Sequence, residues 1–308
     1  MAMGKRLSIL LSCVFLTVLF SACNKSVDLK LRLQPGDKRV VELRSDVDVT
    51  MSLMGMEIPL PKGATERYAL EVLSVDDSGA ATAKVTTNIE SLLGIWAAQF
   101  DTMGDGGSPL GKVGDFDLTV TIAPDGTVRS VDGMEPVVES LVKDMKEEMQ
   151  KQMVQLMANM SPQAQAEMAK RGGLDGMLDE VAKGIREQLN DDKAQKKLQE
   201  VFDFYPSEPV RVGSTWSKDK TVDGIKESTT YTVAARGGGV MNINVKTSVS
   251  GSYEGMDAAS GDTSLSGEES GTLQIDEATG WVLTGKMDSS VSGFLKGKGT
   301  DYIESRAE

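Results

Sequence analysis

The chain has 308 residues, a formal net charge of -13 and no histidine. Because histidine is the commonest metal ligand and the commonest general base of enzymes, its absence excludes most zinc hydrolysis and Ser-His or Cys-His catalysis. The 46 acidic residues outnumber the 33 basic ones, which argues against a nucleic-acid partner because phosphate binding depends on Lys and Arg. We therefore expect a protein that is not an enzyme and that uses no cofactor or metal.

The N-terminus carries a short basic stub followed by an apolar run at residues 7–20. This run is shorter than the about 20 apolar residues needed to cross a bilayer, so it predicts the core of a signal peptide. Next comes Phe20-Ser21-Ala22-Cys23, which resembles the lipobox of bacterial lipoproteins. The resemblance implies cleavage between Ala22 and Cys23, loss of residues 1–22 and acylation of the Cys23 sulfur.

An acylated Cys23 predicts a protein that is tethered to a membrane by lipid and does not span it. Asn24 follows the cysteine, and by resemblance to the sorting rule of enterobacterial lipoproteins it favours the outer membrane. We expect a cell-envelope location facing the periplasm or the exterior. An ordinary secretory signal with an incidental cysteine is the alternative interpretation.

Two parts of the mature chain have the pattern of β-strands. Apolar and polar residues alternate from Leu29 to Val131 and again from Val210 to Ile303, which is the period of half-buried strands. Turn signals such as Asp125-Gly126 interrupt the alternation. We predict a first β unit at residues 23–133 and a second at residues 204–308.

The two β units share short motifs in the same order, while the loops between the motifs differ in length. This order favours an internal duplication; the alternative is that all alternating strands with glycine turns look alike. The paired motifs are Gly36-Asp37-Lys38-Arg39 with Gly213-Ser214-Thr215-Trp216, Tyr68-Ala69-Leu70 with Tyr231-Thr232-Val233, residues 81–85 with residues 241–245, and Val120-Thr121-Ile122 with Leu273-Gln274-Ile275.

Between the β units, the apolar period changes to three and four residues over residues 134–203, which predicts a helical insertion. Ser161-Pro162 has the form of a helix start, and residues 174–189 predict a further helix before a last short one that ends at Phe202. Methionines form a stripe on the first helix. They predict packing against the protein's own sheet or, alternatively, a ligand or partner surface at Met145, Met149, Met153 and Met157.

Carboxylates occur as sequence neighbours, as in Asp76-Asp77 and Glu268-Glu269. Adjacent residues on a strand point to opposite faces, so such a pair cannot face one substrate as a glycosidase dyad does. We expect these pairs to be solvated surface charge.

The segment Tyr205–Trp216 reads Pro-x-x-Pro-Val-x-Val-Gly-x-x-Trp after its first residue and opens the second β unit. Together with Pro35-Gly36-Asp37 and the Met-rich insertion, it resembles a bacterial lipoprotein family of uncharacterised function, DUF6263. The likeness extends over nearly the whole mature chain. The family has no assigned activity, so the resemblance implies no catalytic residue.

The sequence as a whole predicts an α+β protein. Two duplicated antiparallel β-sheet units would form one interlocked domain, a sandwich or an open barrel, with the helical insertion packed over it. A curved sheet covered by helices encloses an apolar space, as in envelope lipid carriers. We expect a membrane-anchored protein that binds an apolar ligand or an envelope partner; the alternative is a structural or assembly lipoprotein with a filled core and an acidic docking surface.

Overall fold

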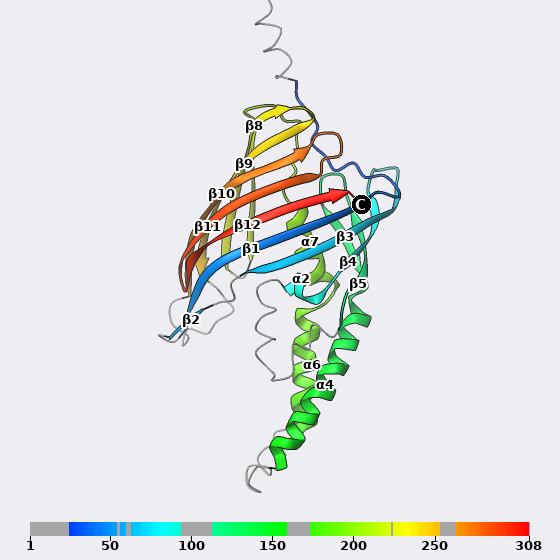
Figure 1. Ribbon diagram of the computed structural model, residues 1–308, viewed down its shortest axis with the longest axis vertical. Coiled ribbons are helices and arrows are strands. Elements are labelled where there is room, and N and C mark those ends of the chain that lie inside the picture. Colours follow the sequence, from blue (N-terminus) through cyan, green and yellow to red (C-terminus); the bar gives the residue numbers. More distant parts are fainter. Residues whose placement is uncertain are drawn as a thin grey trace, which may run out of the picture.

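The computed structural model describes residues 25–53, 56–59, 63–93, 113–158, 173–222, 224–252 and 263–307. Within them, twelve strands form one antiparallel sheet in the order β6-β5-β4-β3-β1-β12-β11-β10-β9-β8-β7, and β2 pairs with β1 beside this path. The sheet is curved, and its edge strands β6 and β7 do not pair with each other (Figure 1). The predicted class, α helices with a large antiparallel sheet, is confirmed, and the described strands form one open sheet, not a sandwich of two.

The sheet has two halves that follow each other in sequence. The N-terminal half-sheet contains β1 (Lys38–Leu53), β3 (Ala64–Val75), β4 (Ala81–Thr87), β5 (Phe116–Ile122) and β6 (Val128–Asp132), with β2 (Met56–Pro59) at its side. The C-terminal half-sheet contains β7 (Thr215–Val222), β8 (Ile225–Gly237), β9 (Val240–Ser252), β10 (Ser264–Asp276), β11 (Val282–Gly293) and β12 (Leu295–Ala307).

The two half-sheets join where β1 pairs with β12. This ladder runs from Arg39 opposite Ala307 to Met51 opposite Leu295, so it extends over most of both strands. A pairing of this length makes the two β units one continuous body.

Three of the predicted helices lie between the half-sheets in the chain. They are α4 (Met134–Ala158), α6 (Gly173–Gln188) and α7 (Asp191–Phe202); a short helix, α2 (Ile89–Leu93), follows β4. The helix predicted to start at Ser161-Pro162 lies outside the described residues. No helix in the described part of the chain has both the length and the apolar character needed to cross a membrane.

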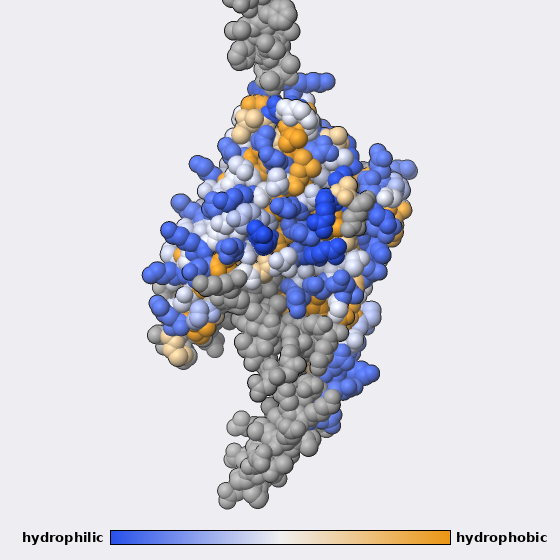
Figure 2. All heavy atoms as spheres, in the orientation of Figure 1, coloured by the Kyte–Doolittle hydropathy of each residue, from blue (hydrophilic) through white to orange (hydrophobic). Residues whose placement is uncertain are grey.

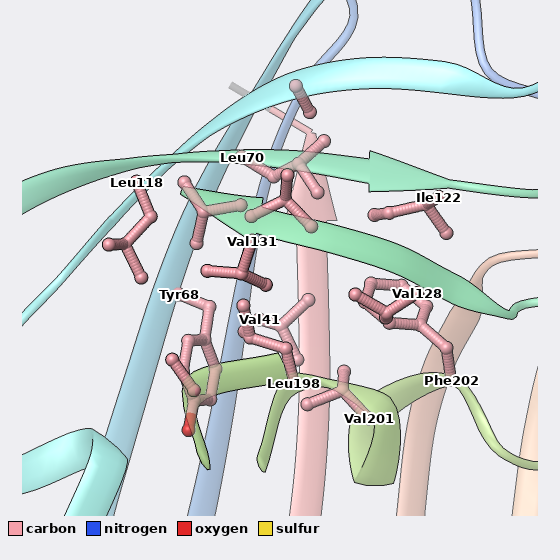
Figure 3. Close-up of a cluster of buried hydrophobic side chains, with 14 of the residues drawn as sticks. Val41, Tyr68, Leu70, Leu118, Ile122, Val128, Val131, Leu198, Val201 and Phe202 are labelled. Atoms are coloured by element: carbon pink, nitrogen blue, oxygen red, sulfur yellow. The ribbon is translucent and has the colours of Figure 1, made fainter. Parts of the chain in front are cut away.

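Helix α7 lies on the concave face of the N-terminal half-sheet, which we call the inner face (Figure 1). Its buried residues include Leu198, Val201 and Phe202. Figure 3 shows these three side chains directed at the strands, where they pack against a second set of buried residues. That second set is Val41, Tyr68, Leu70, Leu118, Ile122, Val128 and Val131.

Two glutamines of α7 bind the free edge of β6. Gln199 accepts a hydrogen bond from the Val128 N–H over 2.8 Å, and Gln195 donates to the Val128 carbonyl over 2.7 Å. Gln199 also donates to the Gly126 carbonyl over 3.1 Å. Because an uncovered edge strand exposes unpaired backbone groups, these amides both satisfy β6 and fix α7 on the sheet.

The alternation that begins at Leu29 does not form a strand before Pro35; residues 28–33 run as an extended segment outside the sheet. Its alternation still decides burial, because Leu29, Leu31 and Leu33 all enter the core. The segment touches both half-sheets: Leu31 N–H donates to the Pro124 carbonyl over 2.7 Å and Arg32 N–H donates to the Thr279 carbonyl over 2.8 Å. It therefore links the β5–β6 turn to the β10–β11 turn.

Gly126, in the β5–β6 turn, lies at a place where an added methyl group should destabilise the fold. It has φ +82°, and an added Cβ would collide with the Phe202 carbonyl and the Tyr205 ring. We expect Gly126→Ala to lower the free energy of unfolding by about 3 kcal/mol, since left-handed strain of about 1–2 kcal/mol and overpacking of about 1–3 kcal/mol add.

Gly36→Ala is the matched control for this measurement by urea denaturation. Gly36 has a similar φ of +89°, but an added Cβ would meet nothing within 4 Å. The free energy of unfolding of this variant should fall by only about 1 kcal/mol, because backbone strain alone opposes folding. If the free energy of unfolding falls equally in the two variants, the contact between the turn and α7 contributes nothing to stability.

Candidate functional site

A large groove lies between α7 and the inner face of the C-terminal half-sheet. Its volume is about 790 Å³, and residues of β1, β7, β8, β9, β10, β11, β12 and α7 line it. The groove exists because α7 covers the inner face of the N-terminal half-sheet, whereas the longer strands of the other half extend beyond it.

One wall of the groove is apolar. Leu43 of β1 pairs with Ile303 of β12, and Leu273 of β10 lies two strands further on the same face. Val245 and Met287 continue this wall in the next row of the sheet. These side chains give the groove a surface that suits hydrocarbon.

Beyond the apolar wall, the groove is lined by polar and charged side chains. Most of its cations are already paired: Lys197 lies 3.0 Å from Glu66, Lys218 lies 3.4 Å from Asp203, and Lys220 lies 3.2 Å from Glu227. Among the other cations that line the groove, Arg44 lies over the Tyr302 ring at 4.7 Å, and Lys196 is exposed on α7.

Glu269 of β10 is the most perturbed carboxyl group of the groove. Burial, followed by the negative charges of Asp301 and Glu227, raises its pKa to about 7; a hydrogen bond with Thr247 and the charge of Lys220 oppose this rise. Thr247 is itself buried and hydrogen-bonded to Thr229 over 3.0 Å. The neutral form of Glu269 is therefore favoured more than that of an exposed glutamate.

The strand alternation explains why Glu269 enters the groove. It lies on the same face of β10 as Leu273 and Ile275, whereas Glu268 points to the exposed outer face. Figure 2 shows that this outer face is mainly hydrophilic. The expectation of solvated surface charge is correct for Glu268 and wrong for Glu269.

Gly271 and Gly285 lie where neighbouring strands of this half-sheet approach closely. A Cβ at Gly271 would lie 2.7 Å from the Met287 Cα, and one at Gly285 would lie 2.5 Å from Ile303 and Leu273 side-chain atoms. Such close approach marks a sharp bend of the sheet that only glycine allows. The bend brings the side chains of the concave face toward one another.

The residues singled out from the sequence lie away from this groove or outside the description. Ala22 and Cys23 precede the described residues, as do all the signal-peptide positions. Met145 is 8% exposed and belongs to the hydrophobic core. Met149, Met153 and Met157 lie within the span of α4, but their side chains are outside the described part.

Comparison with known proteins gives a family match over part of the chain and no activity. Residues 166–282 match the model of DUF6263, a family of unknown function. The resemblance predicted from the sequence is thereby confirmed over this segment, which includes the Tyr205–Trp216 motif and strands β7 to β10. The match does not include the first β unit, so it does not show the likeness expected over nearly the whole mature chain. No curated protein matches the chain.

No group of three or more acidic or cysteine side chains in the described ranges lies close enough together to hold a metal ion. The carboxylates that influence Glu269 come from β8 and β12, two strands away on either side. They act on Glu269 through their charge and not as a shared set of ligands.

The raised pKa of Glu269 predicts how stability depends on pH. Because the folded state holds this proton more tightly than the unfolded chain, the contribution of Glu269 is lost as pH rises from its ordinary pKa of 4.5 toward 7. We expect the free energy of unfolding of the wild type to fall, relative to Glu269→Gln, by up to about 3 kcal/mol between pH 5 and pH 8.

The control for this urea-denaturation series is Glu268→Gln, which removes the neighbouring carboxyl on the exposed face. It should keep the pH dependence of the wild type. A Glu269→Gln profile parallel to that of the wild type would mean that Glu269 has an ordinary pKa.

Proposed function

We propose that the protein is a non-enzymatic, membrane-anchored lipoprotein of the cell envelope that binds a ligand with an apolar part in the groove. The observation that carries the proposal is the groove itself, about 790 Å³ in volume and apolar along one wall. Small-molecule sites usually measure about 300–1,000 Å³ and combine apolar walls with a few polar groups. The groove has both properties.

The rival proposal is a structural or assembly lipoprotein with a filled interior and an acidic docking surface. Its support is the centre of the fold, where Phe202, Tyr205 and Trp281 surround a void of only about 10 Å³. This region is packed to the density expected of a core. The groove lies beside it and remains open, which favours the binding proposal.

An internal duplication, which we propose as the origin of the sheet, accounts for the position of the groove. The turns Gln34–Asp37 and Arg211–Ser214 have the same hydrogen bonds. In each, the third residue donates its N–H over 2.8 Å to the carbonyl of a valine, Val72 or Val233, and that valine donates back to the fourth residue. In each, the fourth side chain accepts from the first N–H.

The register of the sheet supports the same correspondence. The β5–β6 ladder shifts between Thr121 and Ile122, and the β10–β11 ladder shifts between Gln274 and Ile275, the residues paired by sequence. If the two half-sheets are copies of one unit, α7 covers the inner face of the N-terminal copy, and the polar end of the inner face of the C-terminal copy is left open to a ligand.

The start of the described chain fits a short connection to an acylated Cys23. The carbonyl of Lys25 already accepts a hydrogen bond from Arg236 over 2.5 Å, so the folded body begins within two residues of the cysteine. Lys25 lies at the β8–β9 end of the strands, whereas the exposed Met56 and Ile58 of β2 lie at the opposite end. We propose that the anchor holds the first of these ends at a membrane, with the outer membrane favoured.

Filling the groove tests the binding proposal. Leu43→Trp places an indole in the groove from β1, and we expect organic extraction and mass spectrometry to recover several-fold less co-purified amphipathic ligand than from the wild type. Leu73→Trp makes the same change at a residue that is 54% exposed and does not line the groove, so it should keep its ligand. A wild-type protein free of any ligand would favour the assembly role.

Removing the thiol tests the anchor. Cys23→Ala leaves no atom for acylation, so we expect the protein to move from the membrane fraction to the soluble fraction of released envelope contents. Cys13→Ala is the matched control, since that cysteine belongs to the signal segment and should not change membrane association. Retention of the Cys23→Ala protein at the membrane by an unprocessed signal is recognised by its higher mass; retention with a processed N-terminus contradicts the proposal.

A further inference from the structure

We infer that one corner of the sheet, clamped to the start of the folded chain, rests on the headgroup surface of the membrane, and that the groove opens at the opposite end. The corner consists of the β8–β9 turn (residues 238–239) and the β10–β11 turn (residues 277–281), and we call it the anchor corner (Figure 1). This inference rests on the proposed acylation of Cys23 and on the proposed groove site, and it adds the direction in which the groove faces.

An ion pair holds the start of the described chain at the anchor corner. Arg236, near the end of β8, donates a hydrogen bond to the Lys25 carbonyl and pairs with Glu277 through two bonds of 2.6 and 2.9 Å. The two paired side chains are only 15% and 19% exposed, so salt screens them less than a surface pair. The Glu277 N–H donates in turn to the Gly239 carbonyl over 2.9 Å. Lys25 is therefore attached to both turns of the corner.

The next residues of the chain continue this attachment. Val27 and Val210 exchange two backbone hydrogen bonds of 2.8 Å, and the Arg32 side chain donates to the Glu277 carbonyl over 3.2 Å. Leu29, between them, is completely buried. The folded body thus holds the chain firmly from Lys25 onward, and no free linker lies within this stretch.

The chain between the clamp and the proposed anchor is short. Only Asn24 separates Cys23 from Lys25. Two residues of fully extended chain span at most about 7 Å. An acylated Cys23 therefore brings the anchor corner to within about this distance of the lipid headgroups.

Charge favours this corner over the rest of the turn end. Residues 25–32 carry three basic side chains and one acidic one. Next to them, the exposed Arg211 balances the exposed Glu208, and Asp276 accepts hydrogen bonds within its own turn. An anionic bilayer surface attracts a nearby Lys or Arg by about 1 kcal/mol and repels acidic groups. The β3–β4 and β5–β6 turns, at the other corner of the same end, contain three acidic residues and no basic one: Asp76, Asp77 and Asp125.

The packed centre of the fold closes the groove toward the anchor corner. Phe202, Tyr205 and Trp281 surround a void of only about 10 Å³ there. The Tyr205 hydroxyl donates to the Gly280 carbonyl of the β10–β11 turn over 2.8 Å, which joins this centre to the corner itself. A ligand in the groove therefore has no path through this end to the membrane.

The groove reaches the surface at the opposite end of the strands. Val222 lines the groove, is 55% exposed and pairs with Ile225 at the β7–β8 turn. From Ile225, β8 runs for 13 residues to the anchor corner, a distance of about 40 Å at about 3.3 Å per residue. Ligand exchange therefore takes place on the aqueous side and not directly with the bilayer that holds the anchor.

The test measures how close each end lies to the headgroups. The acylated full chain is placed in vesicles of phosphatidylcholine and phosphatidylglycerol that contain a lipid with a nitroxide on its headgroup. A fluorophore is attached at Ala278→Cys in the anchor corner or at Val222→Cys beside the groove; both positions are exposed. We expect the nitroxide to quench the Ala278 label at least about threefold more than the Val222 label, because β8 separates them by about 40 Å.

Lengthening the tether separates the clamp from the anchor. A Gly-Ser insertion of about ten residues between Asn24 and Lys25 keeps Cys23 but adds a flexible tether of about 18 Å. The protein should remain on the vesicles, and quenching of the Ala278 label should fall by about half or more, since the corner is no longer held at the headgroups.

Breaking the clamp should have the same effect. Arg236→Met removes the bonds to Lys25 and Glu277, so we expect it to lower quenching of the Ala278 label without releasing the protein. Arg306→Met is the matched control, because it removes an exposed arginine–glutamate pair with Glu42 and should leave quenching unchanged.

The outcomes separate this inference from the proposed anchor. If the protein stays on the vesicles but the two labels are quenched equally, or the Val222 label more, the orientation is wrong and the anchor stands. A difference that the insertion leaves unchanged contradicts the clamp. If the acylated protein does not stay on the vesicles, the proposed anchor fails as well. Stronger quenching at Ala278 that falls with the insertion and with Arg236→Met, but not with Arg306→Met, supports the inference.

Discussion

The contact between α7 and the inner face of the N-terminal half-sheet decides the rest of the architecture. A sheet this long exposes two faces, and its concave face must be covered by something apolar. Leu198, Val201 and Phe202 cover one half of it, and the glutamines of the same helix close the β6 edge. A helix of 12 residues is about 18 Å long, so it cannot also cover the longer strands of the other half. The uncovered part becomes the groove.

Curvature then turns an uncovered surface into a hollow. Gly271 and Gly285 allow the backbones and side chains of β10, β11 and β12 to approach more closely than a Cβ would permit. The same glycines add no side chains of their own to the inner face. The glycines therefore allow the bend, and the groove is the part of the bent inner face that α7 does not cover.

Much of the fold could be predicted from the sequence because its apolar residues repeat regularly, at every second residue in the strands and at every three or four residues in the helices. Alternation gave Phe116–Ile122 as a strand, and the helical insertion appears between the half-sheets as expected. The pairing of β1 with β12 was not predicted, because it joins residues 244 to 268 positions apart and leaves no local signal. The extended segment at residues 28–33 has the alternation of a strand, and its leucines are buried as that alternation predicts. Its backbone hydrogen bonds, however, go to the turns of two hairpins and not to a neighbouring strand.

The polar part of the site was missed for a reason that the sequence itself contains. The neighbouring carboxylates Glu268 and Glu269 were treated as one solvated pair, although alternation requires them to point in opposite directions. Leu273 and Ile275 fix which face of β10 is apolar, and counting back from them by twos reaches Glu269. An acidic residue in step with the core residues of its strand must either be paired, be neutral or meet a ligand. Glu269 has no ion pair within the described residues, and burial together with the charges of Asp301 and Glu227 raises its pKa to about 7, so its environment favours the second of these.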